Sequence, residues 1–170
     1  KEGLPGNDIT NICEDAEANI WIATNGFGVS MFDGQKFTNF SKKDGLGEDV
    51  VYKIFLDSKK KLWFATFGGG ISVYEGKKFK TYTIADGLPC NEFFTITEDK
   101  FGTMWFGSRG KGIVKFQDGK FYSYTKADGL SFDKVYSLYF DKTGKLWIGT
   151  TAGGICTMYE QEIKPFVIPG

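Results

Sequence analysis

The chain has 170 residues, of which 41% are hydrophobic and 17% aromatic, a composition that suits a folded globular protein and argues against disorder. Lys and Arg number 21, as do Asp and Glu, so no overall field draws the chain to nucleic acid or to an anionic membrane surface. No run approaches the roughly 20 apolar residues that span a bilayer, so we expect no membrane span in this segment. The 17 Phe, 8 Tyr and 23 Gly favour strands and tight turns over helices.

A repeat of 42 residues runs through the chain, and such a period decides the architecture before any other pattern. The motif Asp-Gly-Leu recurs at residues 44–46, 86–88 and 128–130, and the first copy, at residues 2–4, has Glu in place of Asp. The residues that keep the same step are Trp21, Trp63, Trp105 and Trp147; Asp15, Asp57, Asp99 and Asp141; and Gly28, Gly70, Gly112 and Gly154.

Each repeat contains four short apolar segments separated by turn residues, which predicts four strands joined as hairpins. In chain order, the first strand is expected at residues 9–14, 51–56, 93–98 and 135–140. The second surrounds the tryptophan, at residues 20–22, 62–64, 104–106 and 146–148, and the third lies at residues 29–32 and their equivalents. The fourth is expected to begin at Phe37, Phe79, Phe121 and Ile163. The tryptophan strands are apolar on both faces, as in a sheet covered on both sides.

The aspartate of each repeat is expected to open the turn between the first and second strands. Gly102 and Gly144 can supply a positive φ in that turn, and Ala18 and Lys60 occupy the same slot in the other repeats. The slot therefore favours glycine without requiring it. A calcium loop is not expected, because residues 57–61 lack the alternating oxygen ligands that calcium needs.

These patterns predict an all-β fold, a β-propeller built from four 42-residue, four-stranded antiparallel blades. We expect one propeller or partial propeller domain over residues 1–170, with blades at about 2–43, 44–85, 86–127 and 128–170. Each tryptophan would lie between neighbouring blades. An open stack of four blades leaves two apolar faces exposed to water, which predicts self-association. The chain begins at Lys1 without Met, so it is also expected to be a mature product or a fragment.

The order of motifs resembles the two-component regulator propeller repeat family. The resemblance rests on the Asp-Gly-Leu motif, on Leu-Trp-Phe-Ala-Thr at residues 62–66, on Gly-Gly-Gly-Ile at residues 68–71, and on a closing Phe-x-x-Tyr-Thr. Pro165 departs from the pattern in the final strand, where proline is tolerated only at an edge. The resemblance implies a periplasmic or extracellular sensor segment of a bacterial signal-transduction protein, with signalling domains elsewhere in the parent chain.

Ligand recognition is expected where the repeats differ on their regular scaffold. The loop before the first strand and the loop between the second and third strands open on the same rim, and six tentative ligand-binding residues lie in the latter loops: Asn25, Phe27, Phe67, Arg109, Lys111 and Thr151. Arginine and lysine could hold a carboxylate or sulfate and phenylalanine could stack on a sugar ring, so an acidic glycan would fit. The alternative is that these are ordinary solvated loop residues. Likewise, Asp8, Asp49, Glu92 and Asp133 are better explained by turn capping than by a metal or acid–base site.

The chain contains no histidine, which removes Ser-His-Asp and Cys-His catalysis and the usual zinc sites. We therefore predict a non-catalytic binding or sensing module, with no catalytic residue, metal or cofactor. A protein–protein assembly scaffold and a carboxylate-dependent carbohydrate-active enzyme remain the alternatives. Of the three cysteines, Cys13 and Cys156 are expected to pack on strands, whereas Cys90 lies in a loop.

Overall fold

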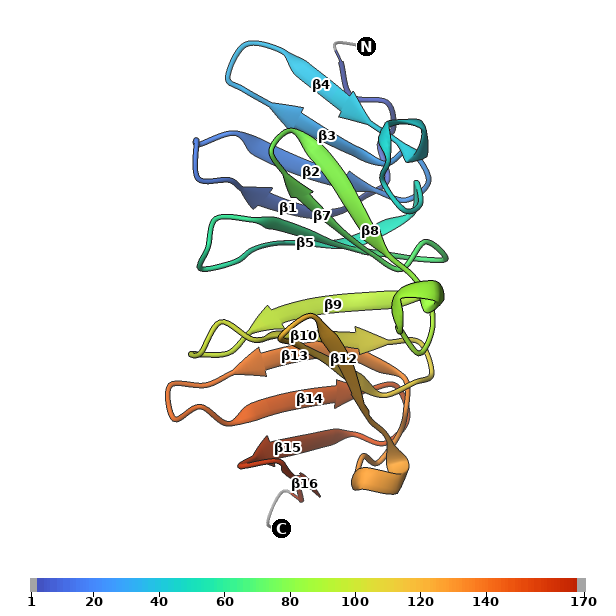
Figure 1. The fold of residues 1–170 in the computed structure, drawn as a ribbon, viewed down its shortest axis with the longest axis vertical. Helices are drawn as coiled ribbons and strands as arrows, with labels where there is room; N and C mark the ends of the chain where they lie inside the picture. The colour runs from blue at the N-terminus through green and yellow to red at the C-terminus, as the bar shows by residue number, and fades with distance from the viewer. Residues whose placement is uncertain (1–2, 168–170) are drawn as a thin grey trace. The chain divides into compact units, whose positions relative to one another are not determined.

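The computed structural model describes residues 3–167, and these residues form four antiparallel sheets of four strands each (Figure 1). Each sheet is a meander of consecutive strands, so the predicted propeller blades are confirmed, and we number them blades 1 to 4 in chain order. The chain divides into two compact units, residues 1–93 and 94–170, and each is considered by itself. Glu2 of the first motif and residues 168–170 of the last repeat lie outside the described residues.

The first unit holds two blades. Blade 1 consists of β1 (Ile9–Glu14), β2 (Ile20–Thr24), β3 (Val29–Phe32) and β4 (Phe37–Phe40). A 3-10 turn, η1 (Lys42–Asp44), leads to blade 2, which consists of β5 (Val51–Leu56), β6 (Leu62–Thr66), β7 (Ile71–Glu75) and β8 (Lys78–Tyr82). A second 3-10 turn, η2 (Ile84–Asp86), follows.

The second unit repeats the arrangement. Blade 3 consists of β9 (Phe93–Glu98), β10 (Met104–Ser108), β11 (Ile113–Gln117) and β12 (Lys120–Tyr124), and η3 (Lys126–Asp128) leads to blade 4. Blade 4 consists of β13 (Val135–Phe140), β14 (Leu146–Thr150), β15 (Ile155–Tyr159) and β16 (Glu162–Pro165). The first strands have the predicted bounds, whereas the fourth strands of blades 2, 3 and 4 begin one residue earlier than predicted. The final strand ends at Pro165 on the edge of its sheet, where a missing N–H is tolerated.

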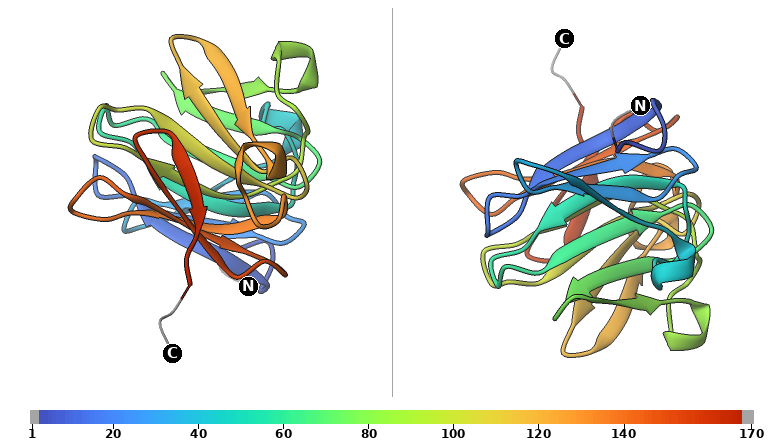
Figure 2. Two further views of the ribbon diagram at one scale, coloured as in Figure 1. Left: turned by 90° about the horizontal axis from the view of Figure 1, so that it is seen from below. Right: turned by 90° about the horizontal axis from the view of Figure 1, so that it is seen from above.

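The Asp-Gly-Leu motif closes a helical turn that the sequence analysis did not predict. In η1, Ser41 accepts a hydrogen bond from the N–H of Lys43, while the Asp44 side chain accepts one from the N–H of Ser41. Gly45 then ends the turn with φ +99°, and Leu46 is buried. The other two turns have the same capping box and glycine end. Each turn lies at the opposite end of its sheet from the hairpin that joins the first two strands, as Figure 2 shows.

One carboxylate in each blade joins the first hairpin to the core. In blade 1, Asp15 Oδ1 accepts the N–H groups of Glu17 and Asn19, and Asp15 Oδ2 accepts the indole N–H of Trp21 at 2.7 Å. The corresponding indole distances in blades 2, 3 and 4 are 2.8, 3.1 and 2.8 Å. Each aspartate thus accepts a backbone N–H within its turn, and it also accepts the indole N–H of the tryptophan in the same blade.

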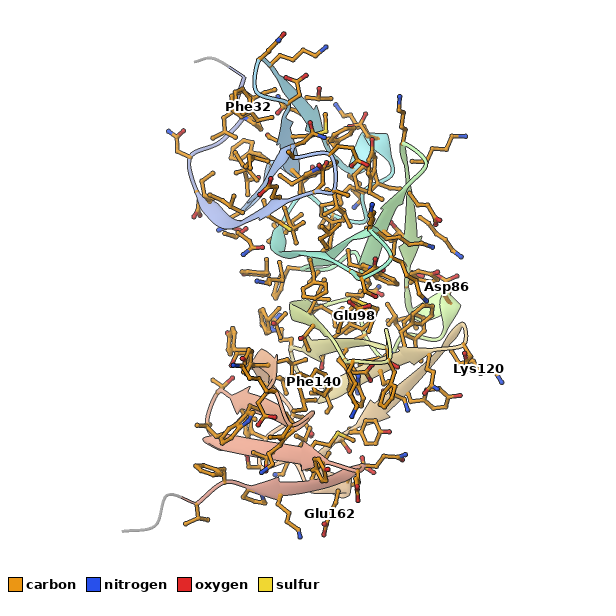
Figure 3. All side chains as sticks on the ribbon, turned by 90° about the vertical axis from the view of Figure 1, so that its left-hand side faces the viewer. Phe32, Asp86, Glu98, Lys120, Phe140 and Glu162 are labelled. Atoms are coloured by element: carbon orange, nitrogen blue, oxygen red, sulfur yellow. The ribbon has the colours of Figure 1, made fainter. Side chains whose placement is uncertain are left out.

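Two of the tryptophans lie between blades, as predicted. Trp21 is fully buried and stacks on Phe40 of its own blade at 5.4 Å between ring centroids, with Tyr74 of blade 2 at 5.0 Å. In the second unit Trp105 packs in the same way against Tyr124 of blade 3 and Phe140 of blade 4. Side chains fill the space between the two sheets of each unit (Figure 3). Burial of these aromatic side chains stabilises each blade pair.

Gly70 and Gly154 occupy the same position in blades 2 and 4, but they differ in how closely other atoms approach them. Gly70 has φ +81°, and an added Cβ would lie 2.0 Å from the carbonyl oxygen of Tyr82. Gly154, at the same place in blade 4, has φ +68° but meets nothing within 4 Å. We expect Gly154→Ala to destabilise by about 1–2 kcal/mol from backbone strain alone. Gly70→Ala should cost about 3 kcal/mol or more, because the clash adds to the strain. Thermal unfolding of both variants checks this, and equal losses would contradict it.

The aspartate pairs predict how stability depends on pH. Hydrogen bonds from Thr143 and Trp147 hold the pKa of Asp141 well below its usual range. Burial alone would raise the pKa of Asp15, but hydrogen bonds from Asn19 and Trp21 outweigh it and lower that pKa. Because the folded pKa values lie below the unfolded value of about 3.9, the stabilisation is complete above about pH 4 and is lost as the pH falls further.

We therefore expect Asp141→Asn to unfold at a lower temperature than the wild type at pH 7, and to lose less of its melting temperature between about pH 6 and 3. Thermal melts across this range measure both quantities. Parallel curves for the two proteins would show that Asp141 does not contribute to the acid sensitivity.

Candidate functional site

In each blade, the loop before the first strand meets the loop between the second and third strands, and we call the edge they form the lead-in rim. In blade 1, the N–H of Asn25 donates to the carbonyl of Asp8 at 2.9 Å, and the Asn25 side chain donates to the Asp8 carboxylate at 2.8 Å. In blade 4, the N–H of Thr151 donates to the carbonyl of Lys134 at 3.1 Å. The backbone thus holds both loops in place.

The glycines of this rim also connect one blade to the next. The N–H groups of Gly26 and Gly28 both donate to the carbonyl of Asp49, at 3.1 and 2.8 Å. In the second unit, the N–H of Gly112 donates to the carbonyl of Asp133 at 2.8 Å. Positive φ values at these glycines aim the N–H groups at the neighbouring loop. The rim is therefore a preorganised surface on which side chains project from fixed positions.

The carboxylates of the lead-in loops are engaged in building the rim. Asp49 Oδ1 accepts the N–H of Lys42, and Asp133 Oδ1 accepts the N–H of Lys126, both at 2.7 Å, so each carboxylate caps the 3-10 turn before it. Within residues 3–167, no group of three His, Cys, Asp or Glu side chains is placed to hold a metal ion. Turn capping accounts for Asp49 and Asp133, in line with the sequence interpretation of these two residues.

The six predicted ligand-binding residues fall into two sets, one in each unit. In the first unit, Phe27 has 53% of its surface exposed, and Phe67 packs edge-on against Tyr52 with centroids 5.7 Å apart. Asn25 shares the loop of Phe27. In the second unit the exposed residues Arg109, Lys111 and Thr151 lie on the loops of blades 3 and 4. The ligand-binding role of all six residues stays a prediction.

Aromatic side chains missed by the sequence analysis lie beside the second set. Phe94 and Tyr136 stack with centroids 4.3 Å apart and ring planes inclined by 23°. Lys134 places its ammonium group 5.2 Å from the centre of the Tyr136 ring and 5.9 Å from that of Phe94. Phe94 is buried, whereas Tyr136 has 48% of its surface exposed. The Tyr136 ring therefore stacks on a buried ring and keeps part of its own surface exposed to solvent.

A bulge explains why this tyrosine projects from the rim. The pairing of β13 with β14 shifts register between Val135 and Ser137, so Tyr136 is the extra residue. The same shift occurs at Thr10 in β1 and at Tyr52 in β5. Bulges redirect side chains at sheet ends. The sequence held one signal for this site, because the second residue of the first strand is aromatic in three of the four repeats.

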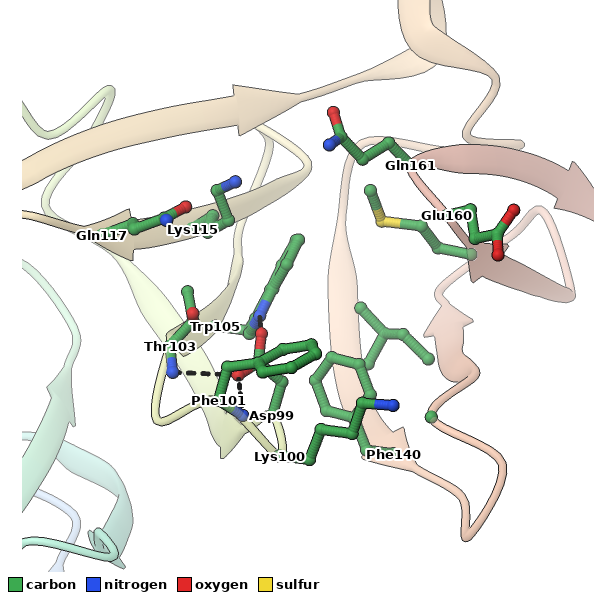
Figure 4. Close-up of a pocket in the computed structure, with 13 residues that line it drawn as sticks. Asp99, Lys100, Phe101, Thr103, Trp105, Lys115, Gln117, Phe140, Glu160 and Gln161 are labelled. Atoms are coloured by element: carbon green, nitrogen blue, oxygen red, sulfur yellow. Dashed lines mark hydrogen bonds between the residues drawn. The ribbon is translucent and has the colours of Figure 1, made fainter.

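A groove also lies between the blades of each unit, at the edge formed by the turns between first and second strands and between third and fourth strands; we call this edge the hairpin rim. The groove in the second unit encloses about 340 Å³ and is lined by Phe101, Trp105 and Gln161, among others (Figure 4). The groove in the first unit encloses about 670 Å³. None of the six predicted ligand-binding residues lines either groove.

The fold and the repeated Asp–Trp hairpins define the chain as a β-propeller repeat protein. A family profile described as two component regulator propeller matches residues 3–26, 87–110 and 129–152. The chain thus carries two-component regulator propeller repeats, in blades 1, 3 and 4. Blade 2 has the same motifs but lies outside the matched residues. No curated protein matches the chain.

Solved structures support the same assignment. The extracellular domain ascribed to a hybrid two-component system of B. thetaiotaomicron matches with 25% identity and a TM-score of 0.88 over 99% of this chain. A second such extracellular domain from the same organism matches with 25% identity and a TM-score of 0.79 over 96% of this chain. The chain spans 26% and 25% of those two structures. The chain is homologous to these extracellular propeller domains.

Virginiamycin B lyase from Staphylococcus aureus has a similar fold, with a TM-score of 0.78, 20% identity, and coverage of 99% of this chain and 59% of the lyase. A histidine-to-alanine variant of that lyase is described as catalytically inactive. At this level of identity the likeness shows the fold alone.

The expected location outside the cytoplasm agrees with the two-component system structures, both of which are extracellular domains. Within residues 3–167, none of the helical turns has the length and apolar character needed to cross a bilayer.

Proposed function

We propose that the chain is a non-catalytic, ligand-sensing segment of a bacterial extracytoplasmic signalling propeller, and that its lead-in rim in the second unit binds a carbohydrate bearing a negative charge. The supported ring of Tyr136 carries this proposal. It offers an exposed aromatic face, backed by Phe94 and flanked by the ammonium group of Lys134. Sugar rings present C–H groups that pack on such faces, and the surrounding cations would select an acidic sugar.

A non-catalytic role is supported by the chemistry that this chain can supply. The chain contains no histidine. In the lyase with a similar fold, a variant in which one histidine is replaced by alanine is described as catalytically inactive. Asp49 and Asp133 on the lead-in rim are held as turn caps, which leaves these two carboxylates poorly placed for proton transfer at a sugar. These features favour binding without turnover over catalysis.

Assembly is a second candidate function, favoured by the exposed blade faces. Ile12 of blade 1 has 61% of its surface exposed, whereas Ile54, its equivalent in blade 2, has 2%. At the other end of the chain, Ile155 is 42% exposed and its equivalent Ile113 is fully buried. The face that covers a neighbouring blade within a unit is thus exposed on blade 1 in the first unit and on blade 4 in the second unit. Another blade, from a second copy or from the parent protein, would cover it.

The carbohydrate proposal is tested with a set of neutral, carboxylated and sulfated oligosaccharides, by calorimetry on the full chain. We expect saturable binding of the acidic members, weakened about tenfold by Tyr136→Ala through loss of the stacking surface. Arg109→Ala with Lys111→Ala should weaken binding about 2- to 10-fold, and more at low salt.

Lys120→Ala is the matched control, because Lys120 is an exposed lysine at the hairpin rim of blade 3. It should leave binding unchanged. New reducing ends or unsaturated products in the same mixtures would overturn the non-catalytic assignment. Absence of glycan binding, together with a dimeric mass by light scattering, would favour the assembly role.

A further inference from the structure

The groove at the hairpin rim of the first unit has a floor of half-buried apolar side chains. Phe40 of blade 1 and Tyr74 of blade 2 lie with ring centroids 5.6 Å apart, and Met31 lines the same space. The Tyr74 hydroxyl makes no hydrogen bond within the described residues. Burial, with a smaller contribution from the charge of Asp15, raises the pKa of Tyr74, so the hydroxyl remains a donor at neutral pH. The floor thus offers ring surface and one donor.

The walls of this groove carry a small excess of positive charge. Four lysines line it, at positions 59, 60, 61 and 77, against three carboxylates. Two of those carboxylates are already engaged: Asp15 accepts the indole N–H of Trp21, and Glu75 pairs with Lys61 at 3.0 Å. Within residues 3–167, the ammonium groups of the other three lysines make no ion pair. The groove therefore joins an apolar floor to unpaired positive charge.

Two of these lysines hold a backbone conformation that suits glycine. Lys60 and Lys77 both have φ +64°, in the left-handed region. In blade 3 the same two positions are Gly102 and Gly119, with φ +81° and +76°. A lysine there carries backbone strain that a glycine would avoid, so two such lysines beside one cavity suggest that their side chains have a use.

The corresponding groove of the second unit lacks these features. Gly144 and Gln161 stand at the positions of Lys60 and Lys77. Lys115 replaces Met31, and its ammonium group lies 5.8 Å from the centre of the Trp105 ring, where Figure 4 shows it over the groove. The volume is about 340 Å³, compared with about 670 Å³ in the first unit. The two grooves thus share a scaffold but differ in charge and room.

We propose that the hairpin-rim groove of the first unit is a second binding site, which takes a small ligand that joins a flat apolar ring to a carboxylate or sulfonate. The ring packs on Phe40 and Tyr74, and the anionic group lies between Lys60 and Lys77. The site is separate from the carbohydrate rim proposed above. Its volume falls in the range of small-molecule pockets, and charge complementarity selects the anion.

The test uses 2-naphthoate and 2-naphthalenesulfonate as probes of the full chain, with neutral 2-naphthol and inorganic sulfate as comparison ligands. Calorimetry measures affinity, and amide chemical-shift changes locate the site. We expect both anionic naphthalenes to bind more tightly than either comparison ligand. The shift changes should centre on the turns at residues 15–19, 57–61 and 75–77.

Lys60→Gly with Lys77→Gly removes the two charges and restores the glycine of blade 3 at both positions. Because glycine relieves the backbone strain, we expect this variant to be at least as stable as the wild type, yet to bind both anions about 4- to 20-fold more weakly. Ala18→Gly is the matched control. It makes the same backbone change, from φ +64°, in the corresponding turn of blade 1, removes no charge, and should leave affinity unchanged.

Equal affinity of the wild type and the double variant would overturn the proposal, as would equal affinity for 2-naphthol and 2-naphthoate. Chemical-shift changes centred on the lead-in rim would overturn it as well. These outcomes are independent of oligosaccharide binding, so either site can fail without the other.

Discussion

The hydrogen bond from the tryptophan indole to an aspartate six residues earlier is the interaction on which each blade depends. A large indole between two sheets contributes much of the apolar contact, but its N–H would be costly to bury without a partner. The aspartate that supplies the partner also accepts backbone N–H groups in the turn, as Asp15 does from Glu17 and Asn19. Turn geometry and core packing are thus fixed by one side chain. A repeat built on this pair positions its second strand relative to the first without help from other blades.

The glycines supply the second constraint, which acts between blades. The paired N–H groups of Gly26 and Gly28 reach the carbonyl of Asp49 in the next blade, and Gly28 leaves no room for a Cβ beside the carbonyl of Phe40. Because these bonds use backbone atoms, they place few demands on the side chains of the loops. The same constraint that joins the blades therefore leaves loop side chains such as Phe27 and Lys111 free to differ between repeats. A rim with a fixed backbone and variable side chains is a suitable surface for recognition.

The strands could be predicted from the sequence because their signals are local and occur four times. The 3-10 turns also have a local sequence signal. Ser41-x-x-Asp44 followed by Gly45 is a capping box with a glycine end, which predicts a short helical turn. In the sequence analysis, this motif is treated only as a marker of the repeat. The bulge at Tyr136 could not be predicted, because register depends on a partner strand. Neither could the grooves, which form between side chains of two blades. The predicted rim residues were chosen by their difference between repeats, and that criterion overlooks a position such as Tyr136, where three repeats are alike in being aromatic.

The carboxylates of the lead-in rim and of the hairpin rim stabilise different parts of the fold. At the lead-in rim, Asp49 and Asp133 cap the 3-10 turns, so these carboxylates hold the backbone on which the variable side chains stand. At the hairpin rim, the repeated aspartate is likewise committed to its tryptophan, and the neighbouring positions accept glycine, alanine or lysine alike. A position that tolerates glycine is one where the side chain adds nothing to the fold. Lys60 and Lys77 occupy such positions, so their ammonium groups are available to the ligand proposed for the first-unit groove.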